Sequence, residues 1–392
     1  MSKMTTDRLY ITKDSCCGCA MCAETCPRHI ITMRSDGEGF LYPEIDNNDL
    51  CIECGACERV CPVKHVNEIR SSFLYAYAGW DKEIGQVISS SSGGAATALS
   101  RYIIRNNGVV YGVAYCKSFL SIEYRRVSKE DELDRLKSSK YVQASKNGLL
   151  KRIKTDLENG KKVLFIGLPC DCAAIKRALG YSGNLYITSL VCHGPTSPLV
   201  HKQYCYELEE KYGSSLKEFS VRYKKDGKWK PYYIFALFED ESQYLEEFEK
   251  TSYNKAFQFF KRPSCNACVF KADKFDADLL IGDFHATKPG TDTFNENGVS
   301  SILVLTERGQ EMMNGISEDF YYKEVDKAIS THQVAINRAV KVRVNRSKFS
   351  SVFQKKGLDA ATRIPSVAVL EMVDHIKIKI KKTGVKVKKI IR

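Results

Sequence analysis

The chain has 392 residues, of which 43% are hydrophobic and 27% charged, so it is long enough for two or three globular domains. No apolar run is long enough to cross a bilayer, which argues against an integral membrane protein. The net charge of +13 comes mainly from the final stretch HIKIKIKKTGVKVKKIIR, without which 52 basic residues face 47 acidic ones, so we expect no nucleic-acid partner.

The first residues, MSKMTTDRLYITKD, contain no apolar segment of the kind found in secretory signals, so we expect a cytoplasmic protein. Thiols stay reduced in that compartment, which argues against a disulfide framework for the sixteen cysteines. Nine of them lie within the first 61 residues. A cysteine-dense module therefore precedes a larger domain.

Two cysteine runs in this module have the same spacing, C-x2-C-x2-C-x3-C followed by proline. They are Cys16, Cys19, Cys22 and Cys26 before Pro27, and Cys51, Cys54, Cys57 and Cys61 before Pro62. This is the spacing of bacterial two-cluster ferredoxins, in which the fourth cysteine of each run ligates the other cluster. We therefore assign Cys16, Cys19, Cys22 and Cys61 to one 4Fe–4S cluster and Cys51, Cys54, Cys57 and Cys26 to a second.

Structural zinc is the alternative for paired C-x2-C motifs, but zinc requires neither the third cysteine nor the repeated Cys-Pro ending. Cys17 is out of register with both runs, and we expect it to be a bystander.

Beyond residue 70 the pattern alternates between strands and helices. FLYAYAGW reads as a strand, QVISSSSGGAATALSRYIIRNN as a strand end, a turn and a helix, and GVVYGVAYC as a β-rich run. KKVLFIGLPC and NLYITSLVCHGP are strands ending in turns, DCAAIKRALG is helical, and DADLLIGDF and SSILVLT are short apolar runs. This order predicts an α/β domain with a mixed or mostly parallel sheet, whose ligand site lies at the carboxyl ends of the strands.

Two polar segments of this domain are candidates for binding an anion. The stretch SSSSGG, residues 89–94, opens a helix whose amide groups and glycines could receive a phosphate, or it is an ordinary serine-capped helix start. LKSSKYVQ, residues 136–143, suits a phosphorylated cofactor or is a solvated loop. No G-x-G-x-x-G or P-loop is present, so no standard nicotinamide or ATP site is indicated.

Four cysteines of the larger domain could form a third set of ligands: Cys170, Cys192, Cys265 and Cys268. They suit a third 4Fe–4S cluster, a zinc site, or buried free thiols. Cys116, Cys172 and Cys205 lie inside β or helical runs and are expected in the core. The sequence isolates no catalytic acid or base.

The order of these motifs, from about Ser15 to Gly309, resembles the coenzyme F420 hydrogenase/dehydrogenase beta subunit family with a fused two-cluster ferredoxin domain. The motifs that carry the resemblance are SSSSGGAATAL, LKSSKYVQ, GLPCDCAAI, VCHGP, RPSCNACVF, ADLLIGDF and NGVSSILVLT.

The resemblance implies an FAD-binding α/β domain that carries its own 4Fe–4S cluster, held by the third cysteine set. It implies a flavin site at Ser91, Ser92, Gly93, Gly94, Lys137, Ser139, Lys140 and Tyr141, with Asp283 nearby. We therefore expect an α+β ferredoxin-like domain over 1–68, an α/β flavin-binding domain with a mixed sheet over 73–320, and a C-terminal extension with a basic tail over 321–392.

Two functions follow from this organisation. The first is an iron–sulfur flavoprotein oxidoreductase that passes electrons between 4Fe–4S clusters and FAD and exchanges a hydride with a deazaflavin-like or other organic substrate. The second is a flavin-free, ferredoxin-like adaptor that delivers electrons to a partner enzyme; some family members of this organisation are associated with surface polysaccharide assembly. The basic tail is expected to be an edge strand, a segment on anionic lipid, or a solvated end.

Overall fold

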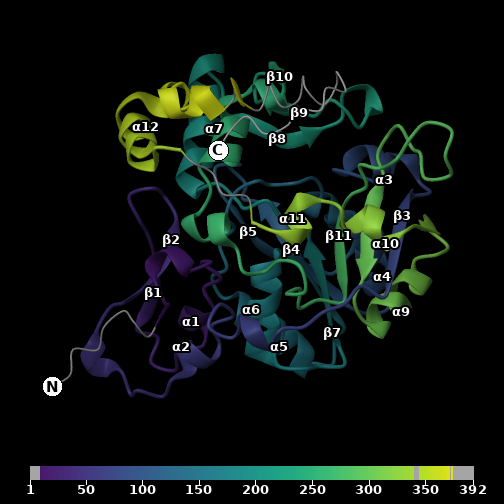
Figure 1. Cartoon of the computed structure of the whole chain (residues 1–392), viewed down its shortest axis with the longest axis horizontal. Helices are drawn as coiled ribbons and strands as arrows, with labels where there is room; N and C mark the ends of the chain where they lie inside the picture. The colour runs from purple at the N-terminus through teal and green to yellow at the C-terminus, as the bar shows by residue number, and fades with distance from the viewer. Residues whose placement is uncertain (1–8, 340–343, 371, 374–392) are drawn as a thin grey trace, which may run out of the picture.

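The computed structural model describes residues 9–339, 344–370 and 372–373 of the chain, and Figure 1 shows the arrangement of its elements. In this part of the protein no helix is both long enough and apolar enough to span a membrane. The predicted basic tail falls outside the described residues.

The N-terminal domain is small and internally repeated. Each cysteine loop leads into a one-turn helix, α1 (Met21–Glu24) after the first loop and α2 (Ala56–Arg59) after the second. Between them, β1 (Ile31–Ser35) and β2 (Leu41–Ile45) pair as an antiparallel hairpin. Short helices and a hairpin around two cysteine loops agree with the expected ferredoxin-like organisation.

An eight-stranded sheet forms the centre of the larger domain, in the order β13-β3-β12-β11-β7-β6-β4-β5. Its strands are β3 (Tyr75–Asp81), β4 (Val109–Tyr115), β5 (Ile122–Val127), β6 (Val163–Gly167), β7 (Leu185–Leu190), β11 (Leu279–Asp283), β12 (Ser300–Val304) and β13 (Phe320–Glu324). The four central strands β4, β6, β7 and β11 are parallel, and the outer pairings are antiparallel. The predicted mixed sheet is thereby confirmed.

Helices cover both faces of this sheet, because its central strands are apolar on both sides. Along β6, Val163 and Phe165 face one core while Leu164 and Ile166 face the other. The first face is covered by α5 (Leu149–Glu158) and α6 (Pro169–Leu179), and the second by α4 (Ala95–Arg105) and α9 (Glu307–Gly315). The N-terminal domain packs against α5 and α6, at the left of Figure 1.

A second, three-stranded antiparallel sheet is inserted between β7 and β11. It comprises β8 (Leu216–Tyr223), β9 (Tyr233–Phe238) and β10 (Gln243–Glu247). A separate core forms between this sheet and the helices α7 (Pro198–Tyr212), α8 (Ser252–Phe259) and α12 (Arg346–Ala361). Two short helices, α10 (Lys327–Thr331) and α11 (Val334–Asn337), precede α12.

The structure corrects two details of the predicted elements. QVIS is part of a short helix, α3 (Ile84–Ser89), not the end of a strand, although its β-branched residues favour a strand locally. In addition, β13 crosses the predicted boundary at residue 320 and pairs with β3. The segment assigned to the C-terminal extension therefore supplies most of one edge strand of the main sheet.

Candidate functional site

The two cysteine loops of the N-terminal domain have the same backbone shape. In each loop the third and fifth residues adopt positive φ angles: 69° at Gly18 and 66° at Ala20, 54° at Glu53 and 69° at Gly55. Left-handed residues in alternation turn the chain tightly around a point, which is how a short loop can aim three cysteines at one group.

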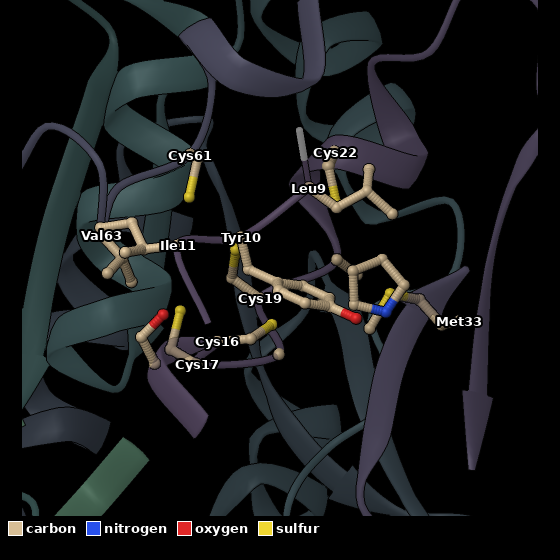
Figure 2. Close-up of a pocket in the computed structure, with 14 residues that line it drawn as sticks. Leu9, Tyr10, Ile11, Cys16, Cys17, Cys19, Cys22, Met33, Cys61 and Val63 are labelled. Atoms are coloured by element: carbon tan, nitrogen blue, oxygen red, sulfur yellow. The ribbon is translucent and has the colours of Figure 1, made fainter. Parts of the chain in front are cut away.

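The first loop encloses a cavity together with a cysteine from the second run. Cys16, Cys19, Cys22 and Cys61 all line it, with Leu9, Ile11 and Val63 among its apolar walls, as Figure 2 shows. Burial raises the pKa of the Cys22 thiol, and the neighbouring Cys16 and Cys61 raise it further. The structure therefore brings together the four cysteines assigned to one cluster, which we call the inner set.

The four cysteines assigned to the other cluster, which we call the outer set, lie further towards solvent. Cys54 is exposed, whereas Cys26 is buried. The pKa of the Cys57 thiol is raised by burial and by Glu58, with a further contribution from Cys26. Cys57 also raises the pKa of Cys22, so the two sets are neighbours.

Each N-terminal set consists of four cysteine thiols and no histidine. Within residues 9–339, 344–370 and 372–373, no three His, Cys, Asp or Glu side chains are close enough to hold a single metal ion. Mononuclear zinc requires four ligands on one ion. A 4Fe–4S cluster distributes four cysteines over four irons, so their sulfur atoms stand further apart. Four thiolates are the donor set of a 4Fe–4S cluster, so both sets fit that group.

The third cysteine set forms at the carboxyl edge of the parallel strands. Cys170 lies in the first turn of α6, directly after β6, and Cys192 follows the adjacent strand β7. Cys265 lies in the 3-10 turn Pro263–Ala267, and Cys268 is the next residue after that turn. Burial raises the pKa of the Cys265 thiol, and the charges of the other three thiols raise it further.

A glycine allows the close approach of two of these segments. Gly194 has a φ of 96°, and a Cβ atom there would lie 2.7 Å from Cβ and 3.0 Å from Sγ of Cys265. Its backbone N–H donates to Sγ of Cys192 at 3.2 Å. Hydrogen bonds to cysteine sulfur are one means by which proteins tune a bound cluster.

Three buried or partly buried cations surround this third set: Lys261, Arg262 and Lys271. Lys271 Nζ donates to the carbonyl of Cys192 at 2.7 Å, and Arg262 donates to backbone carbonyls and Gln143. None of the three is paired with a carboxylate among the described residues. Buried positive charge without a counterion is unfavourable, so the site fits an anionic group such as a thiolate-bound cluster.

Cys17, which the sequence predicts to be a bystander, lies between the inner set and the third set. It lines the inner cavity and packs beside Cys61, Cys170 and Cys268 around a small apolar cluster that includes Val63. Because Cys17 and Cys61 belong to the N-terminal domain and the other two to the α/β domain, this contact joins the two domains directly. Cys172 and Cys205 are buried in the core, as expected, while Cys116 is partly buried.

Several of the residues expected to bind flavin gather around one buried arginine, Arg222, at the same edge of the sheet. Arg222 donates to the Tyr141 hydroxyl at 2.8 Å, to the Ser91 carbonyl at 2.8 Å and to the Asp283 carboxylate at 2.9 Å. The Ser91 and Ser139 hydroxyls are 2.9 Å apart. Arg222 Nε is buried and has no hydrogen-bond partner in the described part of the chain.

The start of α4 is less open than the sequence suggests. Ser92, Gly93 and Gly94 are all buried, and the amides of Gly93 and Ala95 donate to the Ser300 hydroxyl at 3.0 and 3.4 Å. A Cβ atom at Gly93 would lie 2.3 Å from the Gly79 carbonyl oxygen, so glycine is required there by packing against β3. Two of the amides considered for a phosphate therefore already have an acceptor.

The two lysines of LKSSKYVQ differ in their surroundings. Lys137 donates to the Ser89 hydroxyl at 3.0 Å and pairs with Asp134 at 2.6 Å. Lys140 is partly buried and donates to the backbone carbonyls of residues 136–138. Burial lowers its pKa to about 7. Lys140 is therefore a cation whose charge changes near neutral pH.

The sequence reasoning missed Arg222 and two aromatic neighbours. The guanidinium carbon of Arg222 lies 3.8 Å from the centre of the Tyr232 ring, and Trp229 Nε1 donates to the Ser91 carbonyl at 3.1 Å. All three belong to the segment VRYKKDGKWKPYY, which runs from β8 towards β9. An arginine among aromatic residues in an otherwise charged stretch is the signal that could have indicated them.

Comparisons with known proteins find matches to two parts of the chain. Residues 160–329 match the family that describes the C terminus of the coenzyme F420 hydrogenase/dehydrogenase beta subunit, and residues 15–66 match the 4Fe-4S dicluster domain. The expected resemblance is thereby confirmed.

Individual relatives were also found. The coenzyme F420-dependent sulfite reductase of Methanocaldococcus jannaschii is 24% identical over 366 residues, 86% of this chain and 52% of that protein, so the chain spans about half of its length. Ferredoxin-1 of Caulobacter vibrioides is 43% identical over 56 residues, 14% of this chain and 44% of that protein. A chain of the F420-reducing NiFe hydrogenase complex from Methanosarcina barkeri aligns with a TM-score of 0.47 and 14% identity, covering 75% of this chain and 91% of that chain.

Proposed function

Because the chain joins a 4Fe–4S dicluster domain to a coenzyme F420 hydrogenase/dehydrogenase beta subunit domain, and is therefore related to iron–sulfur oxidoreductases, we propose that it is an iron–sulfur flavoprotein oxidoreductase. It would pass electrons between 4Fe–4S clusters and FAD and exchange a hydride with a deazaflavin-like or other organic substrate. FAD, when bound, supplies the exchange between one-electron and two-electron chemistry.

The observation that carries this proposal is the continuity of the three cysteine sets with the Arg222 site. The outer set neighbours the inner set, and Cys17 and Cys61 pack beside Cys170 of the third set. Cys192 and Asp283 follow or end adjacent parallel strands, β7 and β11. Short separations between redox groups are what an electron-transfer protein has to provide, and the chain's role is to hold those groups in place.

We assign the residues of the N-terminal domain to two clusters as the sequence suggests. Cys16, Cys19, Cys22 and Cys61 would hold one, Cys26, Cys51, Cys54 and Cys57 the second, and Cys170, Cys192, Cys265 and Cys268 a third. The carboxyl edge of the sheet would hold the flavin, with Ser91, Tyr141 and Asp283 positioned by Arg222 and Ser139 by the Ser91 hydroxyl. Lys140 would supply a cation for its phosphates.

Cofactor content after anaerobic purification tests the function. We expect about twelve irons, a matching amount of sulfide and one FAD per chain. About eight irons without flavin would instead identify the flavin-free adaptor, in which the α/β domain serves a partner protein. The Gly94→Asp variant separates the possible flavin positions: loss of FAD with all iron retained supports a site at the start of α4, and full flavin occupancy rules out that placement.

A further inference from the structure

The interface between the dicluster domain and the α/β domain contains a buried arginine, Arg262, whose side chain is 1% exposed. It belongs to the segment that carries Cys265 and Cys268 of the third set, and it lies three residues before Cys265. Its Nε donates to the carbonyl of Cys16 at 2.7 Å, and its Nη2 donates to the carbonyl of Leu41 at 2.9 Å. Both acceptors belong to the dicluster domain, so one side chain of the α/β domain reaches two separate segments of its neighbour.

Gln143 completes the junction from a third direction. Its Oε1 accepts a hydrogen bond from Arg262 Nη1 at 3.1 Å, and its Nε2 donates to the carbonyl of Gly18 at 3.2 Å. Gly18 fits tightly here, because a Cβ atom would lie 2.3 Å from Gln143 Nε2 and 2.8 Å from Arg262 Cζ. The cysteine loop of the inner set is therefore seated on the Arg262–Gln143 pair.

The charge of Arg262 has no carboxylate partner in the described part of the protein. Its other contacts are with the rings of Tyr42 and Phe40. Cysteines of two sets lie within its field: the charge of Arg262 lowers the pKa of Cys16 of the inner set and of Cys265 of the third set, against the larger upward effect of burial. A buried cation between two cysteine sets is what two anionic clusters would require.

We propose that Arg262 is a positioning residue that fixes the inner cluster site against the third cluster site and raises the reduction potentials of both. The proposal rests on the proposed function, since it assumes that both cysteine sets carry clusters. Each cluster gains one electron on reduction and becomes one unit more negative. A fixed positive charge nearby stabilises that reduced form and so raises the reduction potential. Among the described residues, Arg262 donates no hydrogen bond to the outer set, so we expect a smaller effect on the potential of its cluster.

The test uses the holoprotein, purified anaerobically, and a potentiometric titration followed by electron paramagnetic resonance. In Arg262→Gln we expect two of the three cluster potentials to fall, each by at least a tenfold change in the equilibrium constant, or about 59 mV for a one-electron step. The potential of the cluster held by the outer set should move much less. Arg262→Lys keeps the charge and should retain most of the potential.

Arg101→Gln is the matched control. Arg101 is also buried, but it pairs with Asp81 at 2.6 Å. It belongs to α4, which lies on the opposite face of the sheet from the dicluster domain. This variant should leave all three potentials unchanged, so that a general effect of losing a buried arginine can be distinguished from the effect of Arg262. Unchanged potentials in Arg262→Gln, with full iron content, would overturn the inference, as would an equal shift of all three.

Gln143→Met provides an independent measurement should Arg262→Gln fail to fold. It keeps the charge but removes one arm of the junction, so the potentials should hold while the domains loosen. Trypsin cleavage after the exposed Arg70, between the domains, should become at least several-fold faster; an unchanged cleavage rate would contradict the positioning role. A wild-type protein without about twelve irons would instead refute the proposed function.

Discussion

Arg222 shows how one side chain can organise a site from four separate segments. It is buried and connects the loop before α4, the LKSSKYVQ segment, the end of β11 and the second sheet. Its remaining donor, Nε, is unused within the described residues. A buried donor of this kind is expected to have a partner when the site is filled, because an unsatisfied polar group is costly.

We therefore expect Arg222→Met to weaken FAD binding. Removing a buried charged donor from a site of this type costs about 2–5 kcal/mol, which is more than a tenfold increase in Kd. The Kd is measured by equilibrium binding of FAD to the iron-loaded protein from which the flavin has been removed. Arg126→Gln is the control, because Arg126 pairs with Asp156 away from this site; similar losses in both variants would show that the effect is only structural.

Lys140 gives the proposed flavin site an expected pH dependence. Burial lowers its pKa to about 7, so the side chain is charged below that pH and neutral above it, and a bound phosphate would move the transition upwards. FAD should therefore be held more tightly at pH 6 than at pH 8.5. The measurement is flavin released on dialysis across this range, and Lys140→Met should remove the dependence. If the dependence persists in that variant, another group is responsible, and Lys224 is the first to test because burial lowers its pKa to about 7 as well.

At the scale of elements, the parallel strands determine where the chemistry lies. Residues that follow β6 and β7 meet at one edge of the sheet because the strands are adjacent and point the same way. Cys170 and Cys192 are brought together by this rule, although more than twenty residues separate them. The second sheet is inserted after β7 and supplies Arg222 to the same edge.

Removing one ligand of the third set should affect only that set. We expect Cys192→Ser to reduce the iron content from about twelve to about eight per chain, with the signals of the two N-terminal clusters retained. Cys172→Ser is the control, because Cys172 is buried in the core and its thiol faces the Thr188 carbonyl at 3.8 Å. An unchanged iron content in Cys192→Ser would exclude Cys192 as a ligand; loss of all iron would indicate unfolding.

Local sequence patterns predicted most of the elements that carry these residues. The strands of the parallel core could be predicted, because each is a short apolar run followed by a turn. The QVIS segment was predicted wrongly, because its β-branched residues favour a strand while the structure has it in α3. The cysteine spacing predicted the partnership of Cys61 with the first loop, since the ferredoxin pattern specifies it.

Contacts between distant segments could not be predicted in the same way. Nothing in VRYKKDGKWKPYY shows that Arg222 will reach Asp283, because the contact depends on how the inserted sheet folds over the edge of the main one. Likewise, Cys17 looks surplus to its motif until the α/β domain is placed beside it. Residues that position a site, such as Arg222, are therefore harder to predict from sequence than ligands that belong to a motif with fixed spacing.

At the scale of the whole molecule, the dicluster domain packs against the α/β domain through specific side-chain contacts. Glu24 accepts a hydrogen bond from the Gly148 amide at 2.7 Å and so caps the start of α5, while Arg177 of α6 pairs with Glu68 at 2.7 Å. The inner set faces this interface, and Leu50, Ile52 and Cys54 are exposed at the outer set. The two ends of the dicluster domain thus have different surroundings, one enclosed by protein and the other open to solvent.

The distances along the chain between the cysteines of the third set have a consequence for biogenesis. The two N-terminal sets use residues 16–61 alone, so their ligands are complete early in synthesis, when chains fold from the N-terminal end. Cys170, Cys192 and Cys265 come together only after strands separated by long connections have paired, and such non-local contacts form slowly. The ligands of the two N-terminal sets therefore become available for cluster insertion earlier in synthesis than those of the third set.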